Sequence, residues 1–203
     1  MVNVILLYIS VMIFLCIYYW SERGDYILIL FHGTSYKRGK NIIKEKRIRV
    51  DASKIYDYTH PMPTTHGFIY LTPDIAIAAF YGNIASIYDK DKEFIVFKIK
   101  VDKNLLKPDY DEKNYTLKFK KKESLTLDES LKLLKSCAID RDICFENFES
   151  YYVVIPTTLY PLNDSDLKRK QLYKDVRELL NKREIDDMEF RNYFMSKLDW
   201  SKL

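Results

Sequence analysis

Apolar and polar positions along this chain follow a two-residue period in some segments, and that period is typical of strands. Residues 25–33 (DYILILFHG) form a β-rich apolar run, and residues 93–102 (EFIVFKIKVD) alternate over their second half. Two further runs, 67–72 (GFIYLT) and 149–162 (ESYYVVIPTTLYPL), also fit strands. The last run is weakened after Pro156 because proline cannot donate to a strand ladder. The pattern therefore predicts four strands.

Other segments carry helical spacing together with helix boundary residues. Residues 35–46 predict a helix with Ser35 as its N-cap. Residues 73–82 predict a second helix, with Pro73 in its first turn and Gly82 at its end. Two more helical segments, one amphipathic and one charged, cover residues 125–137 and 163–203.

Strands and helices are interspersed along the chain, but the predicted strands are short and irregularly spaced. This arrangement favours the α+β class over a doubly wound parallel sheet. The polar segments 50–66 and 103–124 predict loops or an edge hairpin. Neither a GxGxxG nor a Walker A sequence occurs, so a nucleotide would not be held by either of those loops.

The start of the chain is an uninterrupted apolar run. No charged residue occurs within residues 2–20, which as a helix would span roughly 28 Å, close to the thickness of a bilayer core. Tyr18, Tyr19 and Trp20 stand where an interfacial aromatic belt is expected. A cleaved signal peptide would need a basic start and a small-residue cleavage site, and a buried core helix would show a polar face. We therefore predict a transmembrane anchor over residues 1–21.

The basic residues around this run predict its orientation. None precedes the run, and the first four that follow it are Arg23, Lys37, Arg38 and Lys40. The positive-inside rule then places the following domain in the cytoplasm. The sequence thus predicts a single-pass membrane protein that contacts the membrane through residues 2–20 and has its following domain in the cytoplasm.

Composition narrows the range of structures and partners. The 203 residues are 47% apolar and 31% charged, which suits one folded domain with an appendage. The net charge of +4 permits contact with phosphate or anionic lipid without requiring it.

Cys137 and Cys144 match no CxxC pattern and are either ordinary thiols, which we favour, or a bridged pair. His60 and His66 have no acidic or cysteine neighbour in the sequence, so no metal site is expected.

One strand end, HGTS at residues 32–35, combines residue types that are scarce here, since the chain has three His and five Gly. It is followed by GFIY, which carries Tyr70, and then by a predicted helix that carries Tyr81, 11 positions after Tyr70. Taken singly, a histidine at a strand end is usually a structural hydrogen-bonding residue, and tyrosine is common in strands. The order and spacing of the three elements carry more information than any one of them.

This order of HGTS, GFIY and a tyrosine 11 residues further on resembles the ADP-ribosyltransferase superfamily, in its poly-ADP-ribose polymerase form. Members of that family have a His-Gly-Ser-like strand end, a Gly-Ile-Tyr-like strand and a helix with a second tyrosine at the same offset. A glutamate then opens a later strand and completes a His-Tyr-Glu triad. The resemblance covers roughly residues 25 to 160 and implies an α+β fold of split antiparallel sheets with flanking helices. It divides the chain into an anchor (1–21), an ADP-ribosyltransferase-like domain (22–162) and a C-terminal helical extension (163–203).

The resemblance implies a role in NAD binding for several residues. His32 would hydrogen-bond a ribose hydroxyl, and Gly33 would offer its backbone to the nicotinamide carboxamide, because only glycine allows so close an approach. Thr34 would line the same site. Tyr70 and Tyr81 would enclose the nicotinamide ring by stacking. NAD is the co-substrate that this arrangement implies.

The reaction that the resemblance implies also needs a carboxylate. Cleavage of the bond between nicotinamide and ribose develops positive charge on the sugar, as in glycoside hydrolysis, and a positioned carboxylate stabilises it. Glu149 is the first choice, which gives His32, Tyr70 and Glu149 as the catalytic residues, and Glu146 is the second. Family members often place the glutamate directly before the aromatic-aliphatic run, and that position here is Ser150 if the alignment shifts by one residue.

A further departure from the family pattern concerns Ala78. The family commonly has a serine at this position, three residues before the second tyrosine, where it helps to hold the carboxamide. One hydrogen bond, worth about 1 kcal/mol net, would be missing here.

Three functions follow from this interpretation. The first is a mono-ADP-ribosyltransferase that transfers ADP-ribose from NAD to a protein, nucleic acid or small-molecule acceptor and releases nicotinamide. The second is an RNA 2′-phosphotransferase-type reaction within the same superfamily. The third is a catalytically degenerate, membrane-tethered domain that binds an ADP-ribose-like ligand or a partner protein.

Overall fold

The computed structural model describes four stretches of the chain, residues 26–53, 64–116, 124–159 and 166–203. Their strands are β1 (Ile27–Ser35), β2 (Arg47–Ile48), β3 (Ile69–Leu71), β4 (Glu93–Asp102), β5 (Lys107–Pro108), β6 (Cys137–Ile139), β7 (Ile143–Cys144), β8 (Ser150–Pro156) and β9 (Ser201–Lys202). Their helices are α2 (Tyr36–Glu45), α3 (Ile75–Asp89), α4 (Tyr110–Thr116), α5 (Leu127–Glu129), α6 (Leu167–Asn181) and α7 (Met188–Ser196). A 3-10 turn (Lys103–Leu105) and a π-helical turn (Ser130–Leu134) complete the elements.

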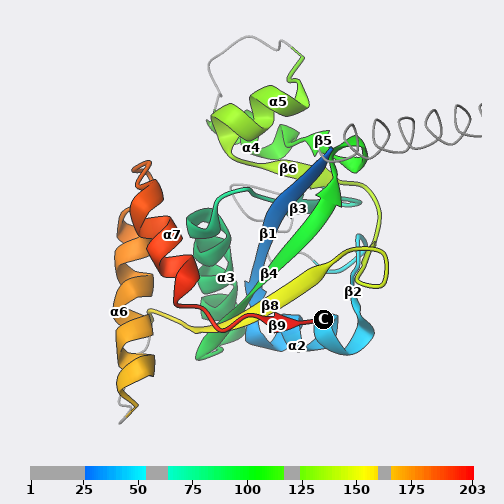
Figure 1. The fold of residues 1–203 in the computed structure, drawn as a ribbon. Coiled ribbons are helices and arrows are strands. Elements are labelled where there is room, and N and C mark those ends of the chain that lie inside the picture. The colour runs from blue at the N-terminus through cyan, green and yellow to red at the C-terminus, as the bar shows by residue number, and fades with distance from the viewer. Residues whose placement is uncertain (1–25, 54–63, 117–123, 160–165) are drawn as a thin grey trace, which may run out of the picture.

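The described strands form three antiparallel sheets. The main sheet has the order β1-β4-β8-β9, a second has the order β3-β6-β5, and β2 pairs with β7. A single bridge between Phe31 and Thr72 joins the outer edge of β1 to the end of β3. The described chain is therefore a mixed α+β structure with antiparallel sheets (Figure 1).

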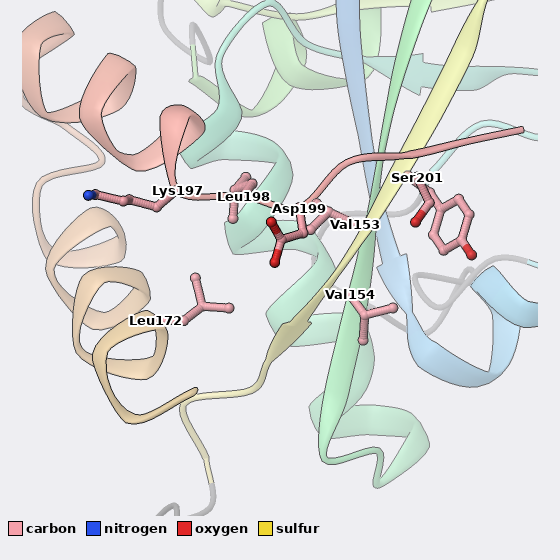
Figure 2. Close-up of a pocket in the computed structure, with 8 residues that line it drawn as sticks. Val153, Val154, Leu172, Lys197, Leu198, Asp199 and Ser201 are labelled. Carbon is pink, nitrogen blue, oxygen red and sulfur yellow. The ribbon is translucent and has the colours of Figure 1, made fainter. Parts of the chain in front are cut away.

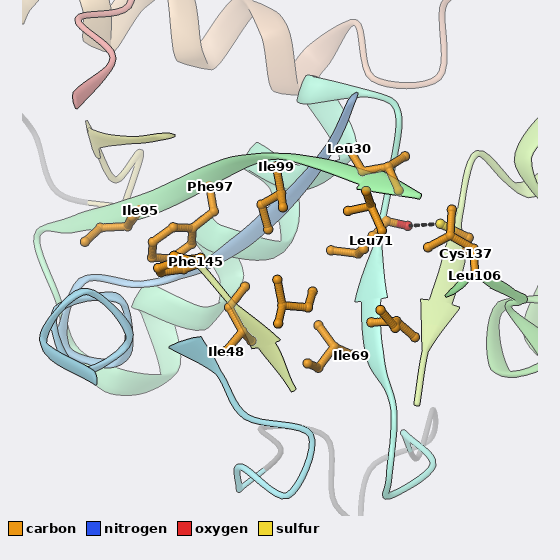
Figure 3. Packing of buried hydrophobic residues seen from close by; sticks show 13 residues of the cluster. Leu30, Ile48, Ile69, Leu71, Ile95, Phe97, Ile99, Leu106, Cys137 and Phe145 are labelled. Carbon is orange, nitrogen blue, oxygen red and sulfur yellow. Dashed lines mark hydrogen bonds between the residues drawn. The ribbon is translucent and has the colours of Figure 1, made fainter. Parts of the chain in front are cut away.

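The main sheet separates two hydrophobic cores, because successive side chains of a strand point to opposite faces. One face contributes Leu30, Phe97 and Ile99 to a core that continues into the β3-β6 sheet (Figure 3). The other face contributes Phe31 and Val96 to a core formed with α3, α6 and α7. This alternation fixes which face each residue of β1, β4 and β8 occupies.

The C-terminal helices belong to the second core. Figure 1 shows α6 and α7 beside α3, and their apolar side chains Val176, Leu179 and Phe194 are all at most 1% exposed. The chain then returns to the main sheet, where β9 pairs with Tyr151 and Tyr152 of β8. The segment predicted as a C-terminal extension is thus packed against the rest of the chain.

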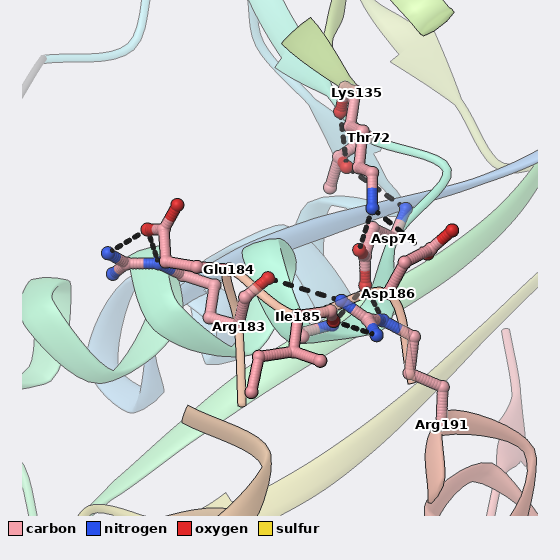
Figure 4. Close-up of polar contacts among 9 residues, drawn as sticks. Thr72, Asp74, Lys135, Arg183, Glu184, Ile185, Asp186 and Arg191 are labelled. Atoms are coloured by element: carbon pink, nitrogen blue, oxygen red, sulfur yellow. Dashed lines mark hydrogen bonds and ion pairs between the residues drawn. The ribbon is translucent and has the colours of Figure 1, made fainter. Parts of the chain in front are cut away.

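A buried ion pair joins these helices to the start of α3. Arg191 Nε donates to Asp74 Oδ1 at 2.8 Å, and the two side chains are 4% and 6% exposed. The Arg191 guanidinium also donates to the carbonyl oxygens of Ile185 and Arg183, while Asp74 caps α3 by accepting from Ala76 N (Figure 4). Both charges therefore have hydrogen-bond partners as well as each other, which a buried pair requires.

Helix α3 extends beyond its predicted end at Gly82. The helix continues to Asp89 and ends at Lys90, which has a φ of 59°. Gly82 lies inside this helix and is buried. A Cβ at this position would stand only 2.7 Å from the Phe94 ring, so glycine is needed for the packing. The sequence prediction mistook a glycine needed for close packing for a helix stop.

Several short elements differ from the sequence prediction. The segment 103–124 was predicted as a loop or edge hairpin but contains α4. The predicted helix 125–137 is divided into α5, a π-helical turn and the start of β6. Strands of two or three residues, such as β2 and β7, are too short for a two-residue period to identify.

The predicted transmembrane helix requires a correction. Residues 1–25, which include the run 2–20, lie outside the described residues. Among the residues that the structure does describe, no helix combines the length and the apolar character needed to cross a membrane. This finding contradicts the transmembrane part of the predicted fold class and the single-pass membrane localisation, and we withdraw both.

The two cysteines in the described chain are both free thiols, so Cys137 and Cys144 are not bridged. Cys137 is fully buried, and burial raises its pKa to about 12. A thiol with so high a pKa stays protonated at neutral pH, which excludes a nucleophilic role for Cys137.

A buried carboxyl group makes the stability of this fold depend on pH. Burial raises the pKa of Asp109, which lies beside Ser136 and accepts from the Glu112 amide. The folded state therefore binds this proton more tightly than the unfolded chain does. As the pH rises from the ordinary carboxyl range through the raised pKa, stability is lost.

We expect Asp109→Asn to be more stable than the wild type at pH 7, because the amide is neutral and still accepts a hydrogen bond. The difference should shrink as the pH falls toward 4, and urea unfolding between pH 4 and pH 8 measures it. Asp128→Asn, at a side chain that is 77% exposed, is the control. A stability difference that is the same at every pH would contradict the explanation.

Candidate functional site

The C-terminal half of β1 exposes backbone groups along its outer edge. Phe31 exchanges both backbone hydrogen bonds with Thr72, on the side away from β4. In an antiparallel pair, alternate residues direct their N–H and C=O groups to the same side. Gly33, two positions after the bridge residue Phe31, therefore directs its amide and carbonyl to that outer edge.

Gly33 also lies directly beneath α3. A Cβ at this position would overlap the carbonyl oxygen of Ala78 and would stand 2.9 Å from the backbone nitrogen of Gly82. Only glycine allows the strand and the helix to approach so closely. Tyr81 is the neighbour of Gly82 in this helix.

His32 lies on the opposite face of β1 from this contact and reaches toward β3. Its Nδ1 is 3.0 Å from the carbonyl oxygen of Tyr70, and its ring is near that of Phe97. A carbonyl oxygen can only accept, so Nδ1 donates this hydrogen bond, and in the neutral tautomer that carries this proton Nε2 is an acceptor. An acceptor at Nε2 is what a ribose hydroxyl requires.

The two predicted tyrosines meet the first turn of α4. Tyr70 Oη donates to Asp111 Oδ2 at 2.5 Å, and Tyr81 Oη is 3.3 Å from Glu112 Oε2. Burial, and then the bond to Asp111, raise the pKa of Tyr70 far above its ordinary value. Tyr70 therefore stays a hydrogen-bond donor at neutral pH.

These contacts form a closed circuit through four residues named from the sequence. It leads from His32 to Tyr70 and from there to the Asp111–Glu112 pair. It continues through Tyr81 and the packing of α3 back to Gly33. The structure thus brings together an imidazole acceptor, an open backbone edge and two phenol rings.

Glu149 is not part of this circuit. It occupies the face of β8 opposite to that of His32, where it accepts from Lys100 Nζ at 2.5 Å and from Tyr151 Oη at 2.6 Å. The Lys100 ammonium and then the Tyr151 hydroxyl hold the pKa of this carboxyl below its ordinary value. Together with Ile29 and Lys98 these three residues line a separate hollow of about 240 Å³.

The first β8 residue on the His32 face is Ser150, which is 1% exposed and donates to the carbonyl oxygen of Phe148 at 2.9 Å. The alternative carboxylate, Glu146, is exposed and directly follows Phe145. The Phe145 ring stacks on that of Phe97, which also contacts His32. Glu146 thus directly follows a residue that packs against Phe97 on the His32 face, whereas Glu149 lies on the other face.

The other residues of interest divide between the site and its surroundings. Thr34 is buried on β1, with its amide nitrogen beside Gly82. His66 lies near β3, whereas His60 falls outside the described residues. Within the described ranges, no group of three or more histidine, cysteine or acidic side chains is arranged to hold a metal ion.

The sequence did not identify Asp111 and Glu112, because their segment was interpreted as a polar loop. The signal that could have found them is the start of a helix, since Asp109 caps the turn by accepting from Glu112 N at 2.9 Å. A capping aspartate followed by two acidic residues is a pattern typical of a first helical turn.

A further hollow, of about 300 Å³, lies between β8, α6 and the segment that follows α7 (Figure 2). It is lined by Val154, Leu172, Lys197 and Asp199, among others, and by none of the residues predicted from the sequence. It is therefore distinct from the His32–Tyr70–Tyr81 site.

Comparisons of the chain with models of protein families, with curated proteins and with solved structures find no match. The resemblance to ADP-ribosyltransferases accordingly stays a hypothesis based on the residues and contacts described above.

Proposed function

We propose that this chain binds NAD at the His32–Tyr70–Tyr81 site and acts as a mono-ADP-ribosyltransferase. The observation that supports this best is the closed circuit of contacts among residues that come from β1, β3, α3 and α4. A hydrogen bond joins His32 to Tyr70, although 38 positions separate them, and the hydroxyls of Tyr70 and Tyr81 contact adjacent residues of α4.

The chemistry of each group fits one part of NAD. The carboxamide carries both donors and an acceptor, which match the carbonyl and the amide of Gly33 on the open strand edge. His32 Nε2 accepts from a ribose hydroxyl, and the Tyr70 and Tyr81 rings contact the nicotinamide. Each residue would thus bind the co-substrate without a change of its charge state.

The proposed reaction is a substitution at the ribose. The bond between C1′ and the nicotinamide nitrogen breaks, and its electron pair leaves with neutral nicotinamide. The acceptor nucleophile forms the new bond to C1′ and gives up its proton to a base. Positive charge on the sugar is stabilised by a carboxylate, for which Glu146 is better placed than Glu149.

A second candidate function is a catalytically degenerate domain that binds NAD or an ADP-ribose-like ligand without turning it over. The specific observation in its favour is that Ser150, and no carboxylate of β8, occupies the His32 face. Binding in this case would use the same four residues as the transferase.

Release of nicotinamide from labelled NAD by the full chain tests the proposal. Glu149→Gln should leave the rate unchanged, because Glu149 lies on the opposite face, paired with Lys100. Glu146→Gln should lower the rate by at least about a hundredfold, the usual effect of losing one electrostatic group in a transition state. Binding without release would favour the degenerate domain, and a rate that depends on Glu149 alone would contradict the site.

A further inference from the structure

The first turn of α4 holds both phenol hydroxyls of the proposed nicotinamide site. Asp111 accepts from Tyr70 of β3, and Glu112 accepts from Tyr81 of α3. Two consecutive carboxylates thus reach two rings that come from different elements. The described part of α4 is therefore the element that connects the two rings to each other.

The position of Asp111 is itself fixed by other bonds. Its Oδ2 accepts from Thr65 N at 2.6 Å and its Oδ1 from the Thr65 hydroxyl at 2.6 Å, in addition to the Tyr70 bond. A carboxylate with three donors around it has little freedom to rotate. The orientation of the Tyr70 ring is consequently set by a group that cannot move independently.

The charge at this turn also has a consequence for ligand choice. The three partners described for Asp111 are neutral groups, so they do not cancel its charge. A phenol that donates to an anion has a more electron-rich ring, and such a ring attracts a cation over its face. The nicotinamide ring of NAD is a planar cation, whereas the dihydronicotinamide of NADH is neutral and similar in size.

We propose that Asp111 and Glu112 are positioning residues that orient the Tyr70 and Tyr81 rings and select the cationic ring of NAD over the neutral ring of NADH. This inference rests on the proposed NAD site. It adds the charge of two carboxylates to the attraction that the tyrosine rings themselves offer to a cation.

The test compares the affinities of the full chain for NAD and for NADH by calorimetry. The wild type should bind NAD roughly tenfold more tightly than NADH. Asp111→Asn and Glu112→Gln keep an acceptor for the hydroxyls but remove the charge, so NAD affinity should fall to that for NADH while NADH affinity stays. Asp111→Ala removes the acceptor as well and should weaken both ligands. Asp128→Asn, an exposed acidic residue of α5, is the control and should change neither affinity.

The possible outcomes distinguish a failure of the selection by charge from a failure of the proposed NAD binding. A wild type that binds both ligands equally, or an Asp111→Asn variant that weakens both by the same factor, overturns the selection by charge and leaves the NAD site intact. A folded wild type that binds neither ligand overturns the proposed function, and this inference with it.

Discussion

Replacing Arg191 by Met is expected to lower the free energy of unfolding by about 3 to 5 kcal/mol, the largest effect of any change considered for this chain. Arg191 is 3% exposed, and its removal leaves the Asp74 carboxylate buried without its cation. The Lys135 ammonium, 3.5 Å from Asp74 Oδ2, is too far away and too exposed to replace the guanidinium, whose Nε lies 2.8 Å from Asp74 Oδ1. Urea unfolding followed by circular dichroism measures the loss.

A matched control is Arg141→Met. That side chain is 60% exposed and its ion pair with Asp140 is long, at 3.8 Å, so the unfolding midpoint should stay that of the wild type. Equal midpoints for Arg191→Met and Arg141→Met would contradict the view that the buried pair holds α7 against α3. The double variant Arg191→Met with Asp74→Leu should recover part of the loss, since no charge is then left unpaired.

Replacing Gly33 by Ala is expected to cost about 3 kcal/mol, the upper end of the cost of overpacking. The new methyl group would meet the backbone of α3 at Ala78 and Gly82, which cannot rotate away as a side chain would. The helix must shift, and Tyr81 would shift with it. Protein that still folds should therefore also bind NAD more weakly, and the stability and the affinity should be measured on the same sample.

The control for this change is Gly67→Ala. Gly67 has a φ of 82° and no atom within 4 Å of its Cβ position, so the cost is the strain of the left-handed conformation, about 1 kcal/mol. Its contacts do not include α3. If Gly33→Ala lowered the free energy of unfolding no more than Gly67→Ala does, the explanation that α3 lies too close to β1 for a side chain at position 33 would be wrong.

Much of the secondary structure could be predicted from sequence because its signals are local. Strand β4 has the predicted bounds, and Ser35 caps α2 by accepting from Arg38 N, as the N-cap pattern indicates. The end of α3 could not be predicted, since Gly82 is required by a contact with Phe94 that no local rule describes. Two-residue strands such as β2 form because a partner strand is available, so long-range contacts and not the local sequence determine where they occur.

The site shows the same division between local and long-range information. His32, Gly33, Tyr70 and Tyr81 were found through order and spacing, and the structure brings them together. Glu149 was chosen on its position before an apolar run, but a shift of one residue changes the face of a strand. Only the register with β4, in which Ile99 pairs with Ser150, and the bond from Lys100 Nζ to Glu149 place its side chain on the other face.

The central claim is that NAD binds at the edge of β1 beside His32, and one titration tests it most directly. Calorimetry of NAD binding to the full chain should show saturable binding to the wild type. His32→Ala should bind at least about tenfold more weakly, through loss of the ribose hydrogen bond and of the Tyr70 contact. Glu149→Ala should bind as the wild type does. A folded wild type that does not bind NAD, or a His32→Ala variant with undiminished affinity, would contradict the claim.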